Sequence, residues 1–238
     1  MNTVAYLQAV RVIVFDLDDT LFPERQYVQS GFRAVSAYLR EKGLVGQDVF
    51  PAMWRRFNAG EHSEIFNRVL EEYGIAPQKA LIDSLVLAYR THRPEISLYP
   101  DARTVLAYFY GRRQLALLSD GYMQMQTAKL ETLGIKHCFS AIVLTDQLGR
   151  DCWKPSPAGF KEIMQTLGSD PAGYVYIGDN PRKDFAAPRQ LGWQSIRVRR
   201  PHGVYAGESA PDTDCEAGFM VDDLYQAARL LDPDFTTP

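Results

Sequence analysis

The feature that most constrains this chain is a short apolar run that ends in a cluster of carboxylates. Residues 12–15 are Val-Ile-Val-Phe, which is typical of a buried strand, and Asp16, Asp18 and Asp19 follow at once. Charges cannot continue into a dry core, so we expect these aspartates at the carboxyl end of the strand, where parallel α/β sheets bind ligands. Carboxylates this close repel each other unless a shared proton lies between them, or a cation such as Mg²⁺, which prefers oxygen ligands. The alternative is a strand followed by a turn that is merely rich in aspartate.

After residue 98 the sequence alternates between short apolar runs and amphipathic segments. The runs expected to be buried strands are 115–118, 141–144, 174–177 and 195–198. Helical periodicity separates them, as over residues 124–133, which Gly134 follows. Strands that alternate with helices predict a parallel sheet with right-handed crossovers. We therefore expect the α/β class, with an open doubly wound parallel sheet.

Residues 22–98 have a different character. They show helical periodicity without a convincing strand, and single glycines divide the pattern into short amphipathic helices. Such helices can bury their apolar stripes against one another without a sheet. We therefore expect an all-helical cap over residues 22–98, inserted after the first strand into an α/β core made of residues 1–21 and 99–238.

Polar groups with phosphate or metal chemistry follow the other expected strands as well. They are Ser119, Asp120 and Gly121 after the second strand, Lys154 in a loop after the third, and Asp179 and Asp184 after the fourth. Each group taken alone has an ordinary alternative, which is a plain turn or a surface lysine before a helix. Together they are the parts that phosphoryl transfer requires: a nucleophile, a proton shuttle, a divalent cation and donors for the phosphoryl oxygens.

These groups resemble the four motifs of the haloacid dehalogenase superfamily in its phosphatase form. The first motif is matched by Asp16-Leu17-Asp18-Asp19-Thr20-Leu21, and the others by Ser119, by Lys154 and by residues 178–184. The agreement covers residue type, order along the chain and placement after strands, and it extends from Val12 to Asp184. The resemblance implies a Rossmann-like catalytic core.

The resemblance also implies the roles of the reacting groups. Asp16 is the nucleophile that becomes an aspartyl-phosphate, and Asp18 protonates the leaving oxygen and later activates water. Lys154 neutralises charge on the nucleophile and on the transferring group. The phosphoryl oxygens are bound by Ser119 and by the backbone amides of Asp120 and Gly121.

A metal site is implied by the same motifs. Mg²⁺ is bound by Asp16, by the backbone carbonyl of Asp18 and by Asp179, while Asp184 supports the metal through its waters or through Lys154. The set is physically coherent, because an aspartate can attack a polyanion only if a cation and hydrogen-bond donors screen the repulsion.

The spacing of the motifs bears on the substrate. The first two lie far enough apart for the helical insertion, and the last two lie too close for another cap. This resembles the subgroup with a helical cap (subclass I), whose members mostly act on small soluble substrates. Cap residues that could bind an anionic or sugar-like leaving group are Arg55, Arg56, Asn58 and His62. The alternative is that these four residues only form a solvated helix end and bind no substrate.

The composition is that of an ordinary globular protein, and it narrows the function classes. A formal net charge of −3 argues against a dedicated nucleic-acid binder. There is no apolar run of membrane-spanning length and no secretion-signal pattern, so we expect neither a membrane protein nor an exported one. Three widely spaced cysteines, Cys138, Cys152 and Cys215, fit a reducing cytoplasm. The sequence does not indicate an oligomeric state.

The function that we expect is a Mg²⁺-dependent phosphomonoester hydrolase acting on a small soluble phosphate ester, such as a sugar phosphate or a nucleotide. A phosphomutase of the same superfamily would use the same residues and stays open, as does a non-catalytic binding protein on this fold. Dehalogenases of the superfamily lack the acid/base aspartate and need no metal, and the phosphonate-cleaving branch has a small residue there. Asp18 therefore argues against both of these chemistries.

Overall fold

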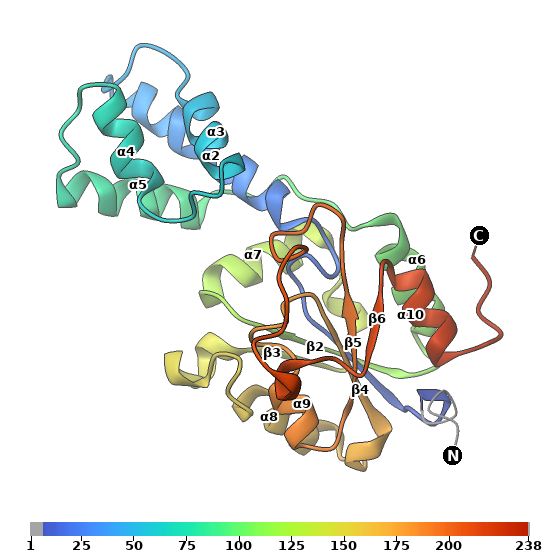
Figure 1. The fold of residues 1–238 in the computed structure, drawn as a ribbon. Coiled ribbons are helices and arrows are strands. Elements are labelled where there is room, and N and C mark those ends of the chain that lie inside the picture. Colours follow the sequence, from blue (N-terminus) through green and yellow to red (C-terminus); the bar gives the residue numbers. More distant parts are fainter. Residues whose placement is uncertain (1–6, 238) are drawn as a thin grey trace. The chain divides into compact units, whose positions relative to one another are not determined.

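The computed structural model describes residues 7–237, which form two compact units (Figure 1). The first, here called the core unit, contains residues 7–24 and 97–237. The second, the helical unit, contains residues 25–96. The chain therefore leaves the core unit soon after its first strand and later returns to it.

The core unit is built around a six-stranded parallel sheet with the order β3-β2-β1-β4-β5-β6. The strands are β1 (Val12–Phe15), β2 (Gln114–Ser119), β3 (Ala141–Leu144), β4 (Tyr174–Gly178), β5 (Gln194–Val198) and β6 (Phe219–Val221). The order reverses at β1, where Val14 lies opposite Ala116 of β2 and Tyr176 of β4. Parallel sheets bind ligands outside the carboxyl ends of their strands at such a reversal, and Asp16 directly follows β1.

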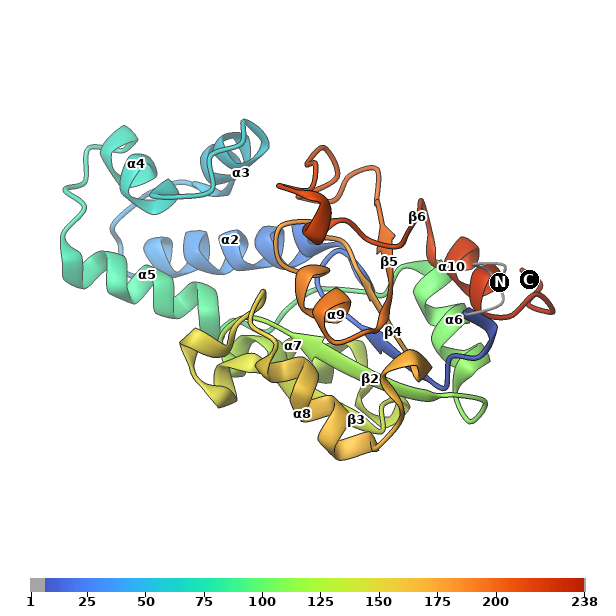
Figure 2. The same ribbon diagram turned by 60° about the horizontal axis from the view of Figure 1, so that its bottom comes forward.

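Both faces of this sheet are buried. Val12 and Val14 belong to a cluster with Phe160 on one face, while Ile13 and Phe15, which alternate with them, are equally buried on the other. The helices of the core unit are α6 (Pro100–Phe109), α7 (Met123–Leu133), α8 (Ala158–Leu167), α9 (Ala186–Gln190) and α10 (Leu224–Leu231). Figure 2 shows α8 and α9 grouped apart from α6 and α10, which pack against each other. The predicted α/β class with a doubly wound sheet is confirmed.

The predicted strands differ from the observed ones mainly at the edge of the sheet. The expected strands 12–15 and 141–144 coincide with β1 and β3. β2 is two residues longer than expected, and β4 and β5 are each one residue longer. β6 was not predicted. It has only three residues at the sheet edge, and Met220 in its middle is 60% exposed, so neither its length nor its apolar pattern marks a strand.

The helical unit consists of short helices around an aromatic centre. They are α2 (Glu24–Glu41), whose first residue belongs to the core unit, α3 (Phe50–Asn58), α4 (Ile65–Glu72) and α5 (Lys79–Thr91). The ring of Phe32 packs edge-on against Phe57 and Phe66, with centroids 6.2 and 6.1 Å away. Gly31 permits α5 to approach α2, because a Cβ there would lie 2.5 Å from a ring carbon of Tyr89. That this unit acts as a cap stays a prediction.

The length and composition of the helices decide whether any of them could span a membrane. Among residues 7–237, no helix has both the length and the apolar character needed to cross a bilayer. The 18-residue helix α2, for example, carries Arg33 and Arg40.

Candidate active site

Lys154 connects two of the carboxylates that the sequence singled out. Its Nζ donates to Oδ1 of Asp16 at 2.6 Å and to Oδ1 of Asp184 at 2.7 Å. It also donates to the hydroxyl of Tyr176 at 2.8 Å. Burial opposes a charged ammonium here, but the carboxylates of Asp16 and Asp184 outweigh it and raise the pKa of Lys154 well above its ordinary value. Lys154 is therefore a fixed positive charge beside Asp16.

Three buried carboxylates come together around this lysine. Asp16, Asp179 and Asp184 each offer an oxygen, and these oxygens lie within 4.8 Å of one another. Burial raises the pKa of Asp16 to about 7, against the opposing effect of Lys154. Burial and the neighbouring Asp184 and Asp16 raise the pKa of Asp179 well above its usual range. Lys154, with Lys183 farther away, leaves the pKa of both Asp16 and Asp179 raised, and a hard divalent cation such as Mg²⁺ fits this oxygen donor set.

Gly178 provides the space for this arrangement. A Cβ at that position would lie 2.6 Å from Oδ2 of Asp184, too close for any other residue to be accommodated without movement. The same Oδ2 accepts a hydrogen bond of 2.9 Å from the backbone N–H of Asn180. The end of β4 therefore fixes Asp184 behind Asp179.

Asp18 is surrounded differently, by two side chains of α7. Its Oδ1 accepts from Nζ of Lys129 at 2.6 Å and its Oδ2 from Nε2 of Gln126 at 2.9 Å. The Gln126 amide also donates to Oγ of Ser119 at 2.6 Å, so that α7 links the ends of β1 and β2. Sequence reasoning missed both residues. Gln126 lies one helical turn before the buried Leu130 and is itself buried, but an apolar-periodicity argument does not predict burial of a glutamine.

The segment after β2 contains a glycine in a backbone conformation that favours glycine. Gly121 has φ +120°, a conformation that L side chains rarely adopt. Asp120 is fixed by a 2.8 Å bond from the Thr145 hydroxyl and by a 3.1 Å bond from the backbone N–H of Lys154. The ends of β2 and β3 and the loop that carries Lys154 are therefore tied together.

The core unit alone forms a pocket of about 370 Å³ at this edge of the sheet. The predicted residues that line it are Asp16, Asp18, Asp120, Gly121, Lys154 and Asp179. Residues that were not predicted line it as well, among them Glu24, Lys183 and Tyr205. Burial and the nearby Asp18 raise the pKa of Glu24 to about 8, so this carboxyl adds a further acid to the pocket wall.

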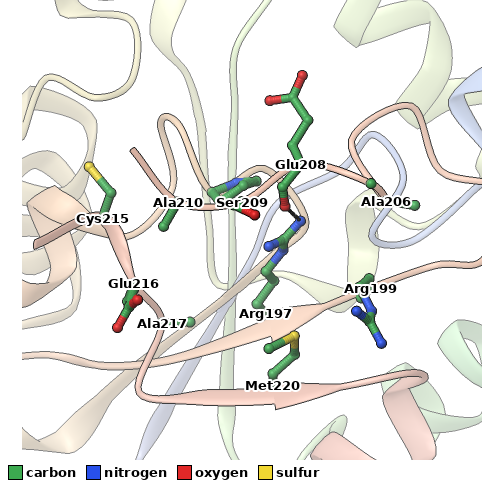
Figure 3. A pocket seen from close by; sticks show the side chains of 12 residues that line it. Arg197, Arg199, Ala206, Glu208, Ser209, Ala210, Cys215, Glu216, Ala217 and Met220 are labelled. Carbon is green, nitrogen blue, oxygen red and sulfur yellow. Dashed lines mark hydrogen bonds between the residues drawn. The ribbon is translucent and has the colours of Figure 1, made fainter. Parts of the chain in front are cut away.

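A buried arginine on β5, Arg197, connects the end of β4 to the loop that contains Tyr205 and Glu208, and Figure 3 shows it bonded to Glu208. Nε of Arg197 donates to the carbonyl of Asp179 at 3.1 Å, and its Nη2 donates to the carbonyls of Tyr205 and Glu208 at 3.0 and 2.9 Å. These bonds fix Tyr205 relative to the end of β4. On its other side Arg197 lines a separate cavity of about 450 Å³, together with Arg199.

The four predicted cap residues lie in the helical unit, where each has a partner. The guanidinium groups of Arg55 and Arg56 pair with Glu72 at 2.8 and 2.9 Å. The side chain of Asn58 accepts a hydrogen bond from Arg25, and His62 packs edge-on against Phe57 at 5.3 Å. Their role in binding a leaving group stays a prediction.

Comparison with known families agrees with this arrangement. Residues 10–192 match the model of the haloacid dehalogenase-like hydrolases. The match covers more than half of the chain, so the chain belongs to this family of hydrolases. Asp18 stands two positions after Asp16, as the resemblance to the phosphatase type of the superfamily predicts.

Relatives with this fold include phosphatases. The phosphoserine phosphatase of Thermus thermophilus is 30% identical over a match that covers 85% of this chain and 94% of that protein. The glyceraldehyde 3-phosphate phosphatase of Methanopyrus kandleri is 28% identical, with 94% and 96% covered. The magnesium-bound HAD hydrolase YfnB of Bacillus subtilis has a TM-score of 0.65 at 17% identity, with 94% and 99% covered, and this likeness shows the fold alone. The chain is thus a phosphatase-type member of the superfamily.

Proposed function

We propose that this chain hydrolyses small, soluble phosphate monoesters with Mg²⁺, through an aspartyl-phosphate formed on Asp16. The enzyme class, a hydrolase of phosphoric monoesters, follows from the family and its phosphatases. The observation that carries the finer proposal is a pair of unlike aspartates at one pocket. Asp16 is buried among acids beside Lys154, whereas Asp18 is bonded to Lys129.

The first step is the attack of Asp16 on phosphorus. Lys154 binds Oδ1 of Asp16, which leaves Oδ2 to form the new bond to phosphorus while the bond to the leaving oxygen breaks. Asp18 in its protonated form donates its proton to that oxygen, so the product leaves as a neutral alcohol. Ser119 and the following backbone amides stabilise the charge on the phosphoryl oxygens.

The second step returns the enzyme to its starting form. Asp18, now a carboxylate, takes a proton from a water molecule, whose oxygen attacks phosphorus and displaces Oδ2 of Asp16. Orthophosphate is released and both aspartates regain their first states. Asp16, the backbone carbonyl of Asp18 and Asp179 would hold Mg²⁺, with Asp184 as a supporting carboxylate, and the cation would screen the nucleophile from the phosphoryl charge.

The substrate class is supported by the pocket and by the relatives. A pocket of about 370 Å³ suits a small ester, and the relatives named for glyceraldehyde 3-phosphate and phosphoserine act on molecules of a few carbon atoms. The proposed location is the cytoplasm, because Cys138, Cys152 and Cys215 are free thiols.

The proposal is tested by the hydrolysis of p-nitrophenyl phosphate with Mg²⁺, with EDTA, and by Asp16→Asn. We expect turnover that needs both the metal and Asp16, because an amide of similar shape is a poor nucleophile. Asp222→Asn makes the same chemical change at a side chain that is 66% exposed, and it should retain activity. Substantial turnover by Asp16→Asn, with the asparagine confirmed by mass spectrometry, would remove Asp16 from this role. Release of orthophosphate distinguishes a hydrolase from a mutase.

A further inference from the structure

One of the cations that line the pocket of the core unit has no carboxylate partner within residues 7–237. The cations that line it are Lys129, Lys154, Lys183 and Arg150. The first three are paired with Asp18 at 2.6 Å, with Asp16 at 2.6 Å and with Asp120 at 3.5 Å, respectively. Among residues 7–237, no carboxylate lies within 4.0 Å of the Arg150 guanidinium.

Arg150 is nevertheless held in a defined position. It begins the 3₁₀ helix η3 (Arg150–Cys152), and its Nη1 donates to the hydroxyl of Tyr122 at 2.8 Å. Its Cζ lies 4.3 Å from the ring centroid of Trp153 and 5.2 Å from that of Tyr122. The two rings meet edge-on at 6.0 Å. An exposed arginine is therefore oriented before any ligand arrives, and this lowers the entropy lost on binding.

A second donor nearby makes no hydrogen bond in the described residues. This donor is Nε1 of Trp153, which is buried. An indole N–H can only donate, so it requires an acceptor from outside. Trp153 lines the same pocket as Arg150. The unneutralised guanidinium favours an anion with acceptor oxygens, and such an oxygen would also satisfy the indole N–H if it reached that atom.

The chain places this cluster beside the groups proposed to bind the phosphoryl group. Tyr122 follows Gly121, and Trp153 precedes Lys154. Since neighbouring Cα atoms lie about 3.8 Å apart, the cluster is one residue away from the phosphoryl-binding groups on two separate segments. A ligand of a few carbon atoms can therefore contact both.

We propose that Arg150, Tyr122 and Trp153 form a subsite for a second anionic group, such as a carboxylate, on the leaving part of the substrate. This rests on the proposed phosphatase function. A guanidinium binds a carboxylate through two parallel N–H donors, a geometry that a neutral hydroxymethyl group cannot match. The aromatic rings serve Arg150 and so are not a stacking platform for a nucleobase.

The test compares two esters that differ only in this group, 3-phosphoglycerate and glycerol 3-phosphate. The wild-type kcat/KM should favour 3-phosphoglycerate by about tenfold or more, as a charge-assisted hydrogen bond implies. Arg150→Gln should lower this ratio about tenfold, mainly through KM, because the contact is made in ground and transition states alike. Trp153→Phe keeps an aromatic ring beside Arg150, removes the N–H and should lower the ratio severalfold.

Arg112→Gln is the matched control. Arg112 is also exposed and stacks on an aromatic ring, with its Cζ 4.1 Å from the Tyr108 centroid, but it does not line the pocket. This variant should retain the wild-type ratio. Equal kcat/KM values for the two esters in the wild type, or a preference that survives Arg150→Gln, would overturn the subsite.

A binding measurement separates this inference from the proposed function. Calorimetry with Asp16→Asn should show a lower Kd for 3-phosphoglycerate than for glycerol 3-phosphate, and adding Arg150→Gln should remove the difference. If this difference in Kd is found but the wild type hydrolyses no phosphate ester, the proposed phosphatase function is wrong and the subsite is supported. If the wild type hydrolyses p-nitrophenyl phosphate but the two esters have equal Kd values, the phosphatase function is supported and the subsite is wrong.

Discussion

Asp16 and Asp18 are two positions apart in the chain, yet the structure surrounds them in opposite ways. Asp16 lies among buried carboxylates, and the ammonium of Lys154 is bonded directly to two of them, Asp16 and Asp184. Asp18 keeps 21% of its side chain exposed, and α7 donates a hydrogen bond to each of its oxygens. The difference matches the two roles that we propose for these aspartates. A fixed, buried carboxylate suits a nucleophile, whereas one in contact with water can exchange a proton.

The largest loss of stability is expected when the partner of the buried aspartate, Asp16, is removed. Lys154→Met leaves Asp16 and Asp184 without their partner in a dry environment. Removing one partner of a buried pair costs about 3–5 kcal/mol in the free energy of unfolding. Urea denaturation followed by circular dichroism measures this loss, and kcat for p-nitrophenyl phosphate should fall about 10²–10³-fold with the missing charge.

The control for this variant is Lys136→Met. Lys136 pairs with Glu131 at 2.9 Å, but its side chain is 45% exposed. Its loss should change the free energy of unfolding by about 1 kcal/mol or less. Equal destabilisation by the two substitutions would contradict the view that Lys154 compensates buried acids.

A second prediction tests the proposed acid/base role of Asp18. Asp18→Asn cannot protonate the leaving oxygen, so kcat/KM for glycerol 3-phosphate should fall about 10²–10⁴-fold. The loss should be smaller for p-nitrophenyl phosphate, whose phenolate leaves without a proton. Since kcat/KM reports steps up to the first irreversible one, it isolates this proton transfer. Equal losses with both esters would assign Asp18 another task.

The sign of the pKa shifts gives a third prediction, for the metal-free protein. Burial raises the pKa of Asp16 to about 7, and that of Asp179 also lies well above its unfolded value. Between about pH 4 and pH 7 the native state therefore binds more protons than the unfolded chain, so the free energy of unfolding falls as the pH rises. Urea denaturation in EDTA across this range measures the fall.

The matched variant for this experiment is Asp179→Asn, which removes one of the titrating groups and should reduce the fall. Mg²⁺ should oppose the fall in the wild type, because it binds the ionised carboxylates of the native state. A wild type and an Asp179→Asn variant with parallel pH profiles in EDTA would show that these acids do not control stability.

The sequence predicted the cluster of Asp16, Asp179 and Asp184 better than it predicted the other residues that line the pocket. The carboxyl ends of parallel strands meet at one edge, so Asp16, Asp179 and Asp184 are brought together by chain order and strand positions alone. The buried apolar runs likewise specified the sheet, because β-branched residues bounded by polar turns have few other solutions. Only the short edge strand β6 escaped this reasoning.

The partners of Asp18 could not be found in the same way. Lys129 lies 111 positions away, and its contact depends on which face α7 turns toward the end of β1. Periodicity predicts that α7 is a helix but favours burying its apolar residues, not Gln126 or Lys129. Arg150 was missed for a similar reason, since its placement depends on rings from two separate loops.

The smallest effect is expected from removing the partner of Asp18. Lys129→Met leaves the Gln126 bond in place, and water can reach the partly exposed carboxylate, so the free energy of unfolding should fall by about 1 kcal/mol. We expect kcat/KM for glycerol 3-phosphate to fall about tenfold, because the orientation of the proton donor is loosened. Lys161→Met, an exposed lysine of α8, is the control. If Lys129→Met destabilises the protein as much as Lys154→Met, then water does not reach Asp18, and the distinction between the two aspartates is wrong.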